Sequence, residues 1–292
     1  MYSAIQANKR NTLLIMALFV GIIGAIGWAV AYLMGDLSIA YGVIIVAAIY
    51  ALIQYFVADK LAIATTGAKA IKKSDNPRLW NIVENLSIRE GLPMPKVYIV
   101  DDPAPNAFAT GRDPNHASVA ATSGILEVMT DRELEAVFAH EMSHVKNYDI
   151  RVSMIAFGLV SVIGLLSDIV FRMFFWGGDR REGNQNPVVM IVGIIIIILA
   201  PIAAMLIQLA ISRQREYLAD ASSVEMTRDP EGLADALEKL QQFARPMQKQ
   251  STSTAHLYIS NPLKSGGISG LFSTHPPLEK RIERLRNQLS EL

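Results

Sequence analysis

Four long apolar runs constrain this chain of 292 residues more than any other feature of its sequence. They cover residues 11–35, 37–58, 152–176 and 183–212, and only Asp168 and Arg172 interrupt the third. A helix rises 1.5 Å per residue, so about 20 apolar residues cross a hydrocarbon core of about 30 Å. The sequence therefore predicts four transmembrane helices. The two charges of the third run lie four residues apart on one helix face, where they can pair or reach the interface.

The first run has a competing interpretation as a cleavable signal peptide. Lys9 and Arg10 would form its basic end, and "AVA" at 29–31 would be the cleavage site. A signal peptide has an apolar region of only about 7–15 residues. The first run is longer and a second apolar run follows at once, so a retained membrane helix is the favoured interpretation.

The composition agrees with a membrane protein and limits the chemistry. Hydrophobic residues make up 51% of the chain and charged residues 18%, whereas soluble domains carry about a quarter charged residues. The net charge is zero, so no bulk electrostatic preference for nucleic acid follows. The chain has no cysteine and five histidines. Disulfides and thiolate ligands are excluded, and a metal ion would need His, Asp or Glu ligands.

Two polar segments, 59–150 and 213–292, alternate with the apolar runs and show soluble-type patterns. The stretch "NPRLWNIVENLSIREG" predicts a helix ended by Gly91, and "KVYIV" predicts a strand. "NAFATG" and "HASVAAT" on either side of "RDPN" predict a hairpin. "DPEGLADALEKLQQFA" and "PPLEKRIERLRNQL" carry apolar residues at helical spacing. The polar part is therefore expected to be an α+β domain with a small sheet.

The stretch "FAHEMSHVKNYD" contains the pattern H-E-x-x-H as His140, Glu141 and His144. Thr130 and Glu133 form a capping box that opens a helix before it. Residues four apart lie on one helix face, so the two imidazoles can bind one Zn²⁺ while Glu141 reaches a water at the ion as general base. The competing interpretation is a helix with two solvated or core histidines. Such a motif on a capped helix is a specific signal for a metallohydrolase.

A catalytic zinc site needs a third protein ligand, and spacing alone does not identify it. Beyond the motif the candidates are His116, His256, His275 and many acids. Glu216 and Asp220 lie four residues apart in "SRQREYLAD", so one could bind the ion while the other accepts a hydrogen bond from a ligand imidazole. The alternative for Glu216 is an ion pair with Arg213 or Arg215.

The motifs together resemble the HtpX family of bacterial membrane zinc metalloproteases, in the same superfamily as the CAAX prenyl proteases. The likeness rests on "HEMSH", the apolar hairpin, "SRQREYLAD", "NAFATG" and "STHPPLEKRIERL", and covers nearly the whole chain. It implies that Glu216 is the third ligand and that Asp220 orients a ligand. It also implies that His275 approaches the substrate or the tetrahedral intermediate, and that Asn106 lies on an edge strand lining the cleft.

The ligand set and the basic residues predict the topology. His140, His144 and Glu216 can meet only if an even number of spans separates them, so the third and fourth runs form a hairpin. Basic residues flank the termini and polar segments, namely Lys9, Arg10, Lys60, Lys69, Lys72, Lys73, Arg213 and Arg215. This favours cytoplasmic termini and a cytoplasmic catalytic domain, and the family resemblance implies the bacterial inner membrane. The region joining the third and fourth runs carries Arg172, Arg180 and Arg181, and these basic residues count against this topology. The acidic residues Asp179 and Glu182 lie among them.

The sequence thus predicts a mostly α integral membrane protein: four transmembrane helices plus a cytoplasmic α+β zincin-like catalytic domain with a small β-sheet. The expected parts are a helix pair (1–58), the first catalytic segment (59–151), a membrane hairpin (152–212) and the second catalytic segment (213–292).

The predicted function is a zinc-dependent endopeptidase with one Zn²⁺ per chain. Glu141 would activate the water, and zinc and His275 would stabilise the oxyanion. The family resemblance implies misfolded or damaged membrane proteins as substrates under stress, and the edge strand near Asn106 favours a substrate that adds as a β-strand. The rivals are a processing protease for one defined, for example lipidated, substrate and a metal-binding membrane protein without hydrolysis.

Overall fold

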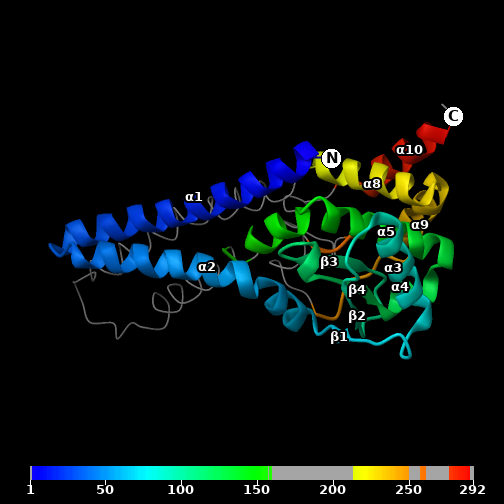
Figure 1. Ribbon diagram of the computed structural model, residues 1–292, viewed down its shortest axis with the longest axis horizontal. Coiled ribbons are helices and arrows are strands. Elements are labelled where there is room, and N and C mark those ends of the chain that lie inside the picture. The colour runs from blue at the N-terminus through cyan, green and yellow to red at the C-terminus, as the bar shows by residue number, and fades with distance from the viewer. Residues whose placement is uncertain (1, 157, 160–212, 250–256, 261–275, 290–292) are drawn as a thin grey trace, which may run out of the picture. The chain divides into compact units, whose positions relative to one another are not determined.

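The structure is a computed structural model that describes residues 2–156, 158–159, 213–249, 257–260 and 276–289 (Figure 1). The described residues are mostly helical and contain one small mixed sheet. It divides into two compact units, and each is treated by itself. Unit 1 comprises Met1–Lys9, Asp59–Met154 and Ile211–Leu292, and unit 2 comprises Arg10–Ala58 and Ile155–Ala210. The first residues of the chain therefore pack with the polar segments, a grouping that the division expected from the sequence did not contain.

Unit 2 holds most of two long helices, α1 (Tyr2–Met34) and α2 (Ser38–Thr66). Between them Gly35 has φ +72°, and Asp36 Oδ1 accepts a hydrogen bond of 2.9 Å from the Ser38 backbone nitrogen. The two helices approach closely where Gly27 faces Val43, because a Cβ on Gly27 would lie 2.7 Å from the Val43 side chain. Glycine thus allows the tight pairing of these two helices.

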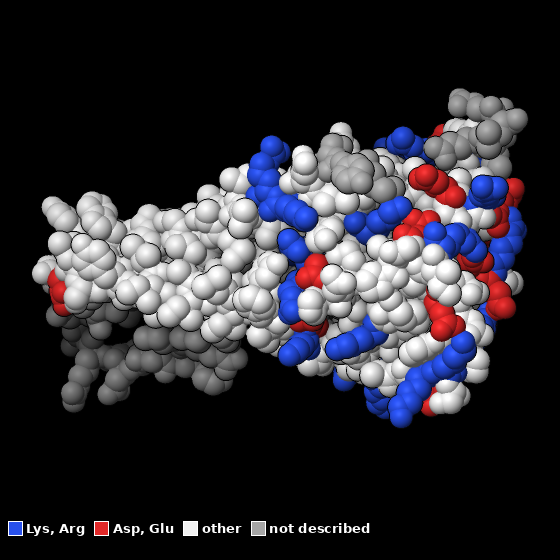
Figure 2. Space-filling view, in the orientation of Figure 1, with Lys and Arg blue, Asp and Glu red and all other residues white. Residues whose placement is uncertain are grey.

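Large apolar side chains cover the outside of this helix pair. Those with at least half of their surface exposed include Leu13, Trp28, Tyr32, Tyr41, Val46 and Leu52. In Figure 2 charged side chains gather over unit 1, while the exposed surface of α1 and α2 in unit 2 carries almost none. A contiguous apolar surface of this kind fits contact with lipid rather than water.

Among the described residues, one segment is long and apolar enough to cross a membrane, namely Ala40–Thr66. It lies in α2 and corresponds to the second predicted span. The first predicted span is helical within α1. Most of the third predicted span and all of the fourth lie outside the described residues.

The sheet of unit 1 has four strands in the order β1-β2-β4-β3. They are β1 (Lys69–Ala70), β2 (Lys96–Val100), β3 (Ala107–Gly111) and β4 (Ala117–Thr122). The predicted strand β2 and the predicted hairpin of β3 and β4 are confirmed, with the 3₁₀ turn Pro114–His116 between the hairpin strands. β2 pairs parallel to β4. This pairing joins segments about 20 residues apart and could not be inferred from local pattern.

Helices cover the sheet and supply most of the core. They are α3 (Pro77–Glu90), α4 (Ser123–Val128), α5 (Asp131–Lys146), α8 (Arg213–Thr227), α9 (Pro230–Gln242) and α10 (Leu278–Leu289). α3 ends at Gly91 as predicted, with φ +64°. α5 contacts β3 and the helices α3, α8 and α9, and Leu134, Val137 and Phe138 of α5 are fully buried. α5 is therefore the central helix of unit 1.

The predicted capping box of α5 is confirmed and fixes where this helix begins. The Glu133 backbone nitrogen donates to Thr130 Oγ1 at 3.4 Å, and Glu133 Oε2 accepts from the Thr130 backbone nitrogen at 2.7 Å. Lys239 Nζ of α9 donates to the same Glu133 oxygen at 2.7 Å. The start of α5 is thus tied both to its own backbone and to α9.

We expect Thr130→Ala to lower the free energy of unfolding by about 1 kcal/mol, because it removes an N-cap acceptor. Thr130→Ser is the matched control, since its hydroxyl can still accept from the Glu133 backbone, and it should retain most of the stability. Thermal unfolding of both variants in the same detergent measures the difference. Equal losses in the two variants would show that the hydroxyl does not cap this helix.

Candidate metal centre

α5 presents His140 and His144 on one face, as the four-residue spacing predicts. The His140 side chain is almost fully buried and that of His144 is 15% exposed. The rings are nearly perpendicular, at 88°, and their Nε2 atoms are 3.2 Å apart. Two ring nitrogens at this separation face one common point beside the helix.

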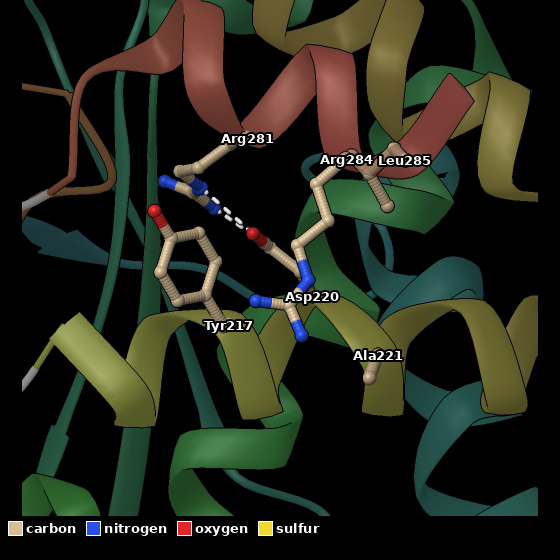
Figure 3. A pocket seen from close by; sticks show the side chains of 6 residues that line it. All are labelled: Tyr217, Asp220, Ala221, Arg281, Arg284 and Leu285. Carbon is tan, nitrogen blue, oxygen red and sulfur yellow. Dashed lines mark hydrogen bonds and ion pairs between the residues drawn. The ribbon is translucent and has the colours of Figure 1, made fainter. Parts of the chain in front are cut away.

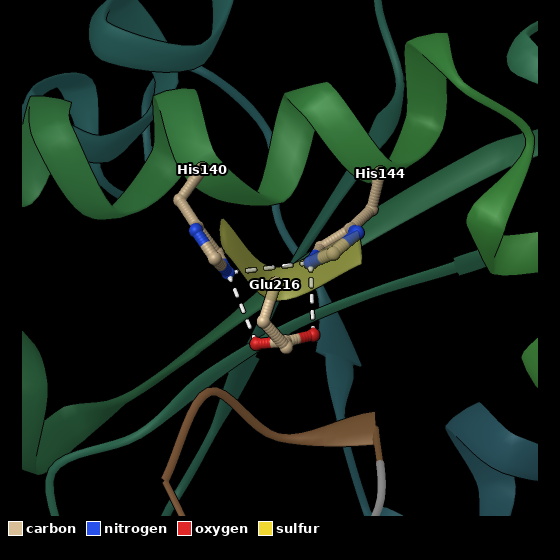
Figure 4. A group of neighbouring side chains, drawn as sticks. All are labelled: His140, His144 and Glu216. Carbon is tan, nitrogen blue, oxygen red and sulfur yellow. Dashed lines mark hydrogen bonds and ion pairs between the residues drawn. The ribbon is translucent and has the colours of Figure 1, made fainter. Parts of the chain in front are cut away.

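α8 brings Glu216 to the same point from more than 70 residues further along the chain (Figure 4). Glu216 Oε1 lies 3.6 Å from His144 Nε2, and Oε2 lies 3.8 Å from His140 Nε2. One ligand atom from each of the three residues lies within 4.8 Å of the others. α8 is fastened to α5 by Ser223, whose buried hydroxyl donates to the Ala136 carbonyl at 2.7 Å.

The three side chains fit a tetrahedral zinc site in geometry. With ligand bonds of about 2.0–2.1 Å, the ligand atoms of a tetrahedral site lie about 3.3–3.4 Å apart. The observed separations of 3.2, 3.6 and 3.8 Å bracket that spacing. Two imidazoles and one carboxylate are also a donor set that catalytic zinc accepts, with one position left for water.

The charges around the site also fit a divalent cation. Among the described residues, four carboxylates and two guanidinium groups surround the two histidines: Glu141, Asp149, Glu216 and Asp220, with Arg215 and Arg281. With neutral imidazoles, four negative and two positive charges leave two negative charges. Buried charge of one sign is costly unless it is compensated. A bound divalent ion would supply that compensation.

Each imidazole is oriented by its own aspartate. Asp220 Oδ1 lies 3.0 Å from His140 Nδ1, and Asp149 Oδ2 lies 3.0 Å from His144 Nδ1. A proton on each Nδ1 leaves Nε2 with its lone pair toward Glu216, and such carboxylate partners raise ligand basicity. The sequence singled out Asp220 for this position but missed Asp149. Asp149 is five residues beyond His144, past the end of α5, so helical spacing could not indicate it.

Arg281 of α10 is a second residue that sequence reasoning missed. Its side chain is fully buried, and Nε and Nη2 donate to the two Asp220 oxygens at 2.9 and 2.6 Å (Figure 3). Arg281 Nη1 lies 3.7 Å from Glu216 Oε2, and Nη2 lies 3.4 Å from His140 Nδ1. The apolar spacing predicted the helix α10 but did not indicate that Arg281 faces inward. The only signal was an arginine where the helix buries its apolar face.

The surroundings move the pKa values of the two histidines in opposite directions. Burial and the positive charge of Arg281 lower the pKa of His140 to about 4, against the effect of Asp220. Burial also acts to lower the pKa of His144, but Asp149, Glu216 and Glu141 outweigh it and raise the pKa to about 9. For Asp220, burial acts to raise the pKa, but Arg281 and His140 outweigh it and lower the pKa to about 2. Asp220 therefore stays ionised, and the side of the site near His144 attracts positive charge.

The remaining predicted site residues have different positions. Glu141 follows His140 in α5, is 3% exposed, and its charge raises the pKa of His144. Asn106 immediately precedes β3 and is also buried. Its Nδ2 donates to the Ser260 carbonyl at 2.8 Å, and its Oδ1 accepts from the Ser260 backbone nitrogen at 3.2 Å. Asn106 thus holds another segment of this chain. His275 lies outside the described residues.

β3 is an edge strand, but part of its free edge is paired. Phe108 forms an antiparallel bridge with Tyr258, the Ile259 backbone nitrogen donates to the Ala107 carbonyl at 3.0 Å, and the rings of Phe108 and Tyr258 pack edge to face at 5.0 Å. Residues 257–260 therefore cover the beginning of β3.

Comparison with known proteins identifies relatives along nearly the whole chain. The sequence pattern of peptidase family M48 matches residues 73–289 of this chain. Proteins named protease HtpX homolog from Tropheryma whipplei (strain Twist) and Ligilactobacillus salivarius (strain UCC118) are 59% and 46% identical to this chain over 286 and 297 residues. Each alignment covers 98% of this chain and 98% or 99% of the relative.

A solved structure shares the fold. The crystal structure of S. mikatae Ste24p aligns with a TM-score of 0.53 at 19% identity, covering 98% of this chain and 67% of that chain. The resemblance to the HtpX family that the sequence motifs indicated is confirmed by the relatives. The match to peptidase family M48 includes the segments that carry His140, His144 and Glu216. With this match and the high identity of its relatives, the chain belongs to peptidase family M48 and is a metalloprotease.

Proposed function

We propose that this metalloprotease is a membrane-integral zinc endopeptidase that cleaves misfolded or damaged membrane proteins. The single observation that carries the zinc assignment is the convergence of His140, His144 and Glu216 within 4.8 Å, from two helices separated by an apolar hairpin in the sequence. The supporting observations are the aspartate behind each imidazole and the net negative charge of the site.

The residues around the site divide the work of peptide hydrolysis. His140, His144 and Glu216 would hold the zinc, which would polarise the scissile carbonyl and lower the pKa of the attacking water. Glu141 takes the proton from that water and later delivers it to the leaving amine. Asp149 and Asp220 hold the two imidazoles in one tautomer and orientation. Arg281 keeps Asp220 ionised. We assign to His275 the stabilisation of the oxyanion that forms as the water adds.

The substrate backbone is proposed to add as a strand along β3. Among the described residues, Tyr258 and Ile259 pair with the beginning of β3, so the substrate either pairs with the rest of the strand, Ala109–Gly111, or replaces these two residues. Asn106, which holds Ser260, would influence which of the two occurs.

For the membrane arrangement we propose four spans, with both termini and unit 1 on the cytoplasmic side of the bacterial inner membrane. The apolar segment Ala40–Thr66 and the exposed apolar side chains of α1 and α2 support insertion. α5 and α8 carry the ligands of one site on either side of residues 152–212, which supports an even number of crossings between them. Unit 1 would then meet polypeptide segments where they leave the bilayer.

We expect Glu141→Gln to lower proteolysis by about 10²-fold or more while zinc binding stays near that of the parent. The variant removes the general base but leaves all three ligands, and acid–base catalysis supplies about that factor. Glu127→Gln, at an exposed position of α4, is the matched control and should keep full activity. Metal analysis and cleavage of an unfolded membrane protein are measured on the same sample. Parent-like turnover by Glu141→Gln would contradict the mechanism.

We expect Glu216→Ala to lose zinc and activity together, because only two imidazole ligands would remain of the three protein ligands that a catalytic zinc site needs. Asp149→Asn and Asp220→Asn should have milder effects, since loss of an outer partner costs about 10–100-fold in affinity or activity. Glu225→Ala is the control, because Glu225 is an exposed acid on the same helix. Zinc titration against a competing chelator ranks the variants. If Glu216→Ala binds zinc as tightly as Glu225→Ala does, Glu216 is not a ligand.

We expect an impermeant thiol reagent outside intact cells to label Gly178→Cys but not Ser74→Cys. Position 178 lies between the third and fourth apolar runs, which the proposed topology places outside the cell, and Ser74 is exposed in unit 1. The chain has no cysteine of its own, so each label reports one site. Labelling of Ser74→Cys from outside would reverse the proposed topology. Labelling after cell lysis serves as the control for reactivity.

A further inference from the structure

Asn8 of α1 contacts the aspartate behind His144, although it lies at the opposite end of the sequence from most of the site. It is only 3% exposed. Its Nδ2 donates to Asp149 Oδ1 at 2.6 Å and to the Asn147 carbonyl at 2.9 Å. A side-chain amide has two N–H donors, and these two contacts use both of them. All three residues belong to unit 1.

The second oxygen of Asp149 contacts the histidine. Asp149 Oδ2 lies 3.0 Å from His144 Nδ1, so the carboxylate connects α1 through one oxygen to His144 through the other. The χ2 torsion of an aspartate is broad, and one hydrogen bond would leave the direction of the carboxylate poorly defined. Asn8 supplies the second point of attachment, and Arg215 Nη1 attracts the Asp149 carboxylate from 3.9 Å.

The corner that presents Asp149 also depends on α1. Tyr148 has φ +63°, a left-handed conformation that costs free energy for a residue with a Cβ and persists only when its surroundings hold it. Lys9 Nζ and the Arg151 guanidinium each lie 4.8 Å from the centre of the Tyr148 ring, within cation–π range. Two consecutive residues of α1, Asn8 and Lys9, therefore contact the three consecutive residues of this corner, 147–149.

We infer that Asn8 is a positioning residue of the metal centre, acting through Asp149 on the orientation of His144. The inference rests on the proposed zinc function and assigns a part of the metal centre to α1. α1 continues without interruption from Asn8 to Met34, so the same helix that forms the first apolar run also helps to set one proposed zinc ligand.

The test measures zinc binding by the full-length protein in detergent. Asn8→Ala should weaken zinc about 3- to 10-fold, less than the 10–100-fold typical of a direct partner of a ligand. It should also shift the visible absorption of the Co²⁺-substituted protein, because the His144 ring is less well fixed. Asn8→Leu keeps the size of the side chain but cannot donate, so it should behave like Asn8→Ala and decides the case if that variant does not fold. Gln6→Ala, exposed on the same helix, is the control and should match the parent.

A double-mutant cycle tests the route. In an Asp149→Ala background, Asn8→Ala should weaken zinc no further. Parent-like zinc affinity and Co²⁺ absorption in Asn8→Ala and Asn8→Leu would overturn the inference, and so would an undiminished loss in the Asp149→Ala background. If the parent protein itself binds no zinc, the proposed function fails. If the parent protein binds zinc and the Asn8 variants bind it as tightly, the proposed function stands and this inference alone fails.

Discussion

The packing of α8 against α5 is the contact on which the rest of the site depends. It places Glu216 and Asp220 opposite two imidazoles in a core where charged groups are nearly out of contact with solvent. A buried charge destabilises a protein unless it is paired or binds a metal ion. The fold meets this cost with partners from several elements: Arg281 from α10, Asp149 from the corner after α5 and Asn8 from α1. The metal centre is therefore also a hub of tertiary structure.

The network is arranged so that its parts have different roles. Arg281 holds the Asp220 carboxylate with two hydrogen bonds, and the pKa of Asp220 falls to about 2, so His140 keeps an ionised partner over the physiological range. Asp149 faces His144, whose surroundings attract positive charge. His140 thus lies beside an ionised carboxylate whose charge is balanced by Arg281, and His144 lies beside an excess of negative charge. The excess of negative charge therefore lies on the His144 side of the site.

The sequence predicted what local pattern determines and missed what distant contacts determine. The helices α3, α9 and α10, the β3–β4 hairpin and the capping box of α5 follow from periodicity and turn residues within one stretch. The pairing of His140 with His144 follows from helix geometry. Asp149 could not be found this way, because the left-handed Tyr148 takes the chain out of helical register just before it. Asn8 and Arg281 reach the site from segments more than 130 residues away from α5 or from its corner, and the parallel β2–β4 pairing depends equally on tertiary contacts.

The pairing of residues 257–260 with β3 has a consequence for inhibition. A peptide that binds at the beginning of β3 must displace residues 257–260, which belong to the same chain as the strand. A tethered competitor acts at an effective concentration on the order of millimolar, so a short strand-like ligand that relies on backbone hydrogen bonds alone is at a disadvantage. A ligand that gains most of its affinity by binding the proposed zinc depends less on that competition. The same self-pairing would filter against short peptides released by other proteases.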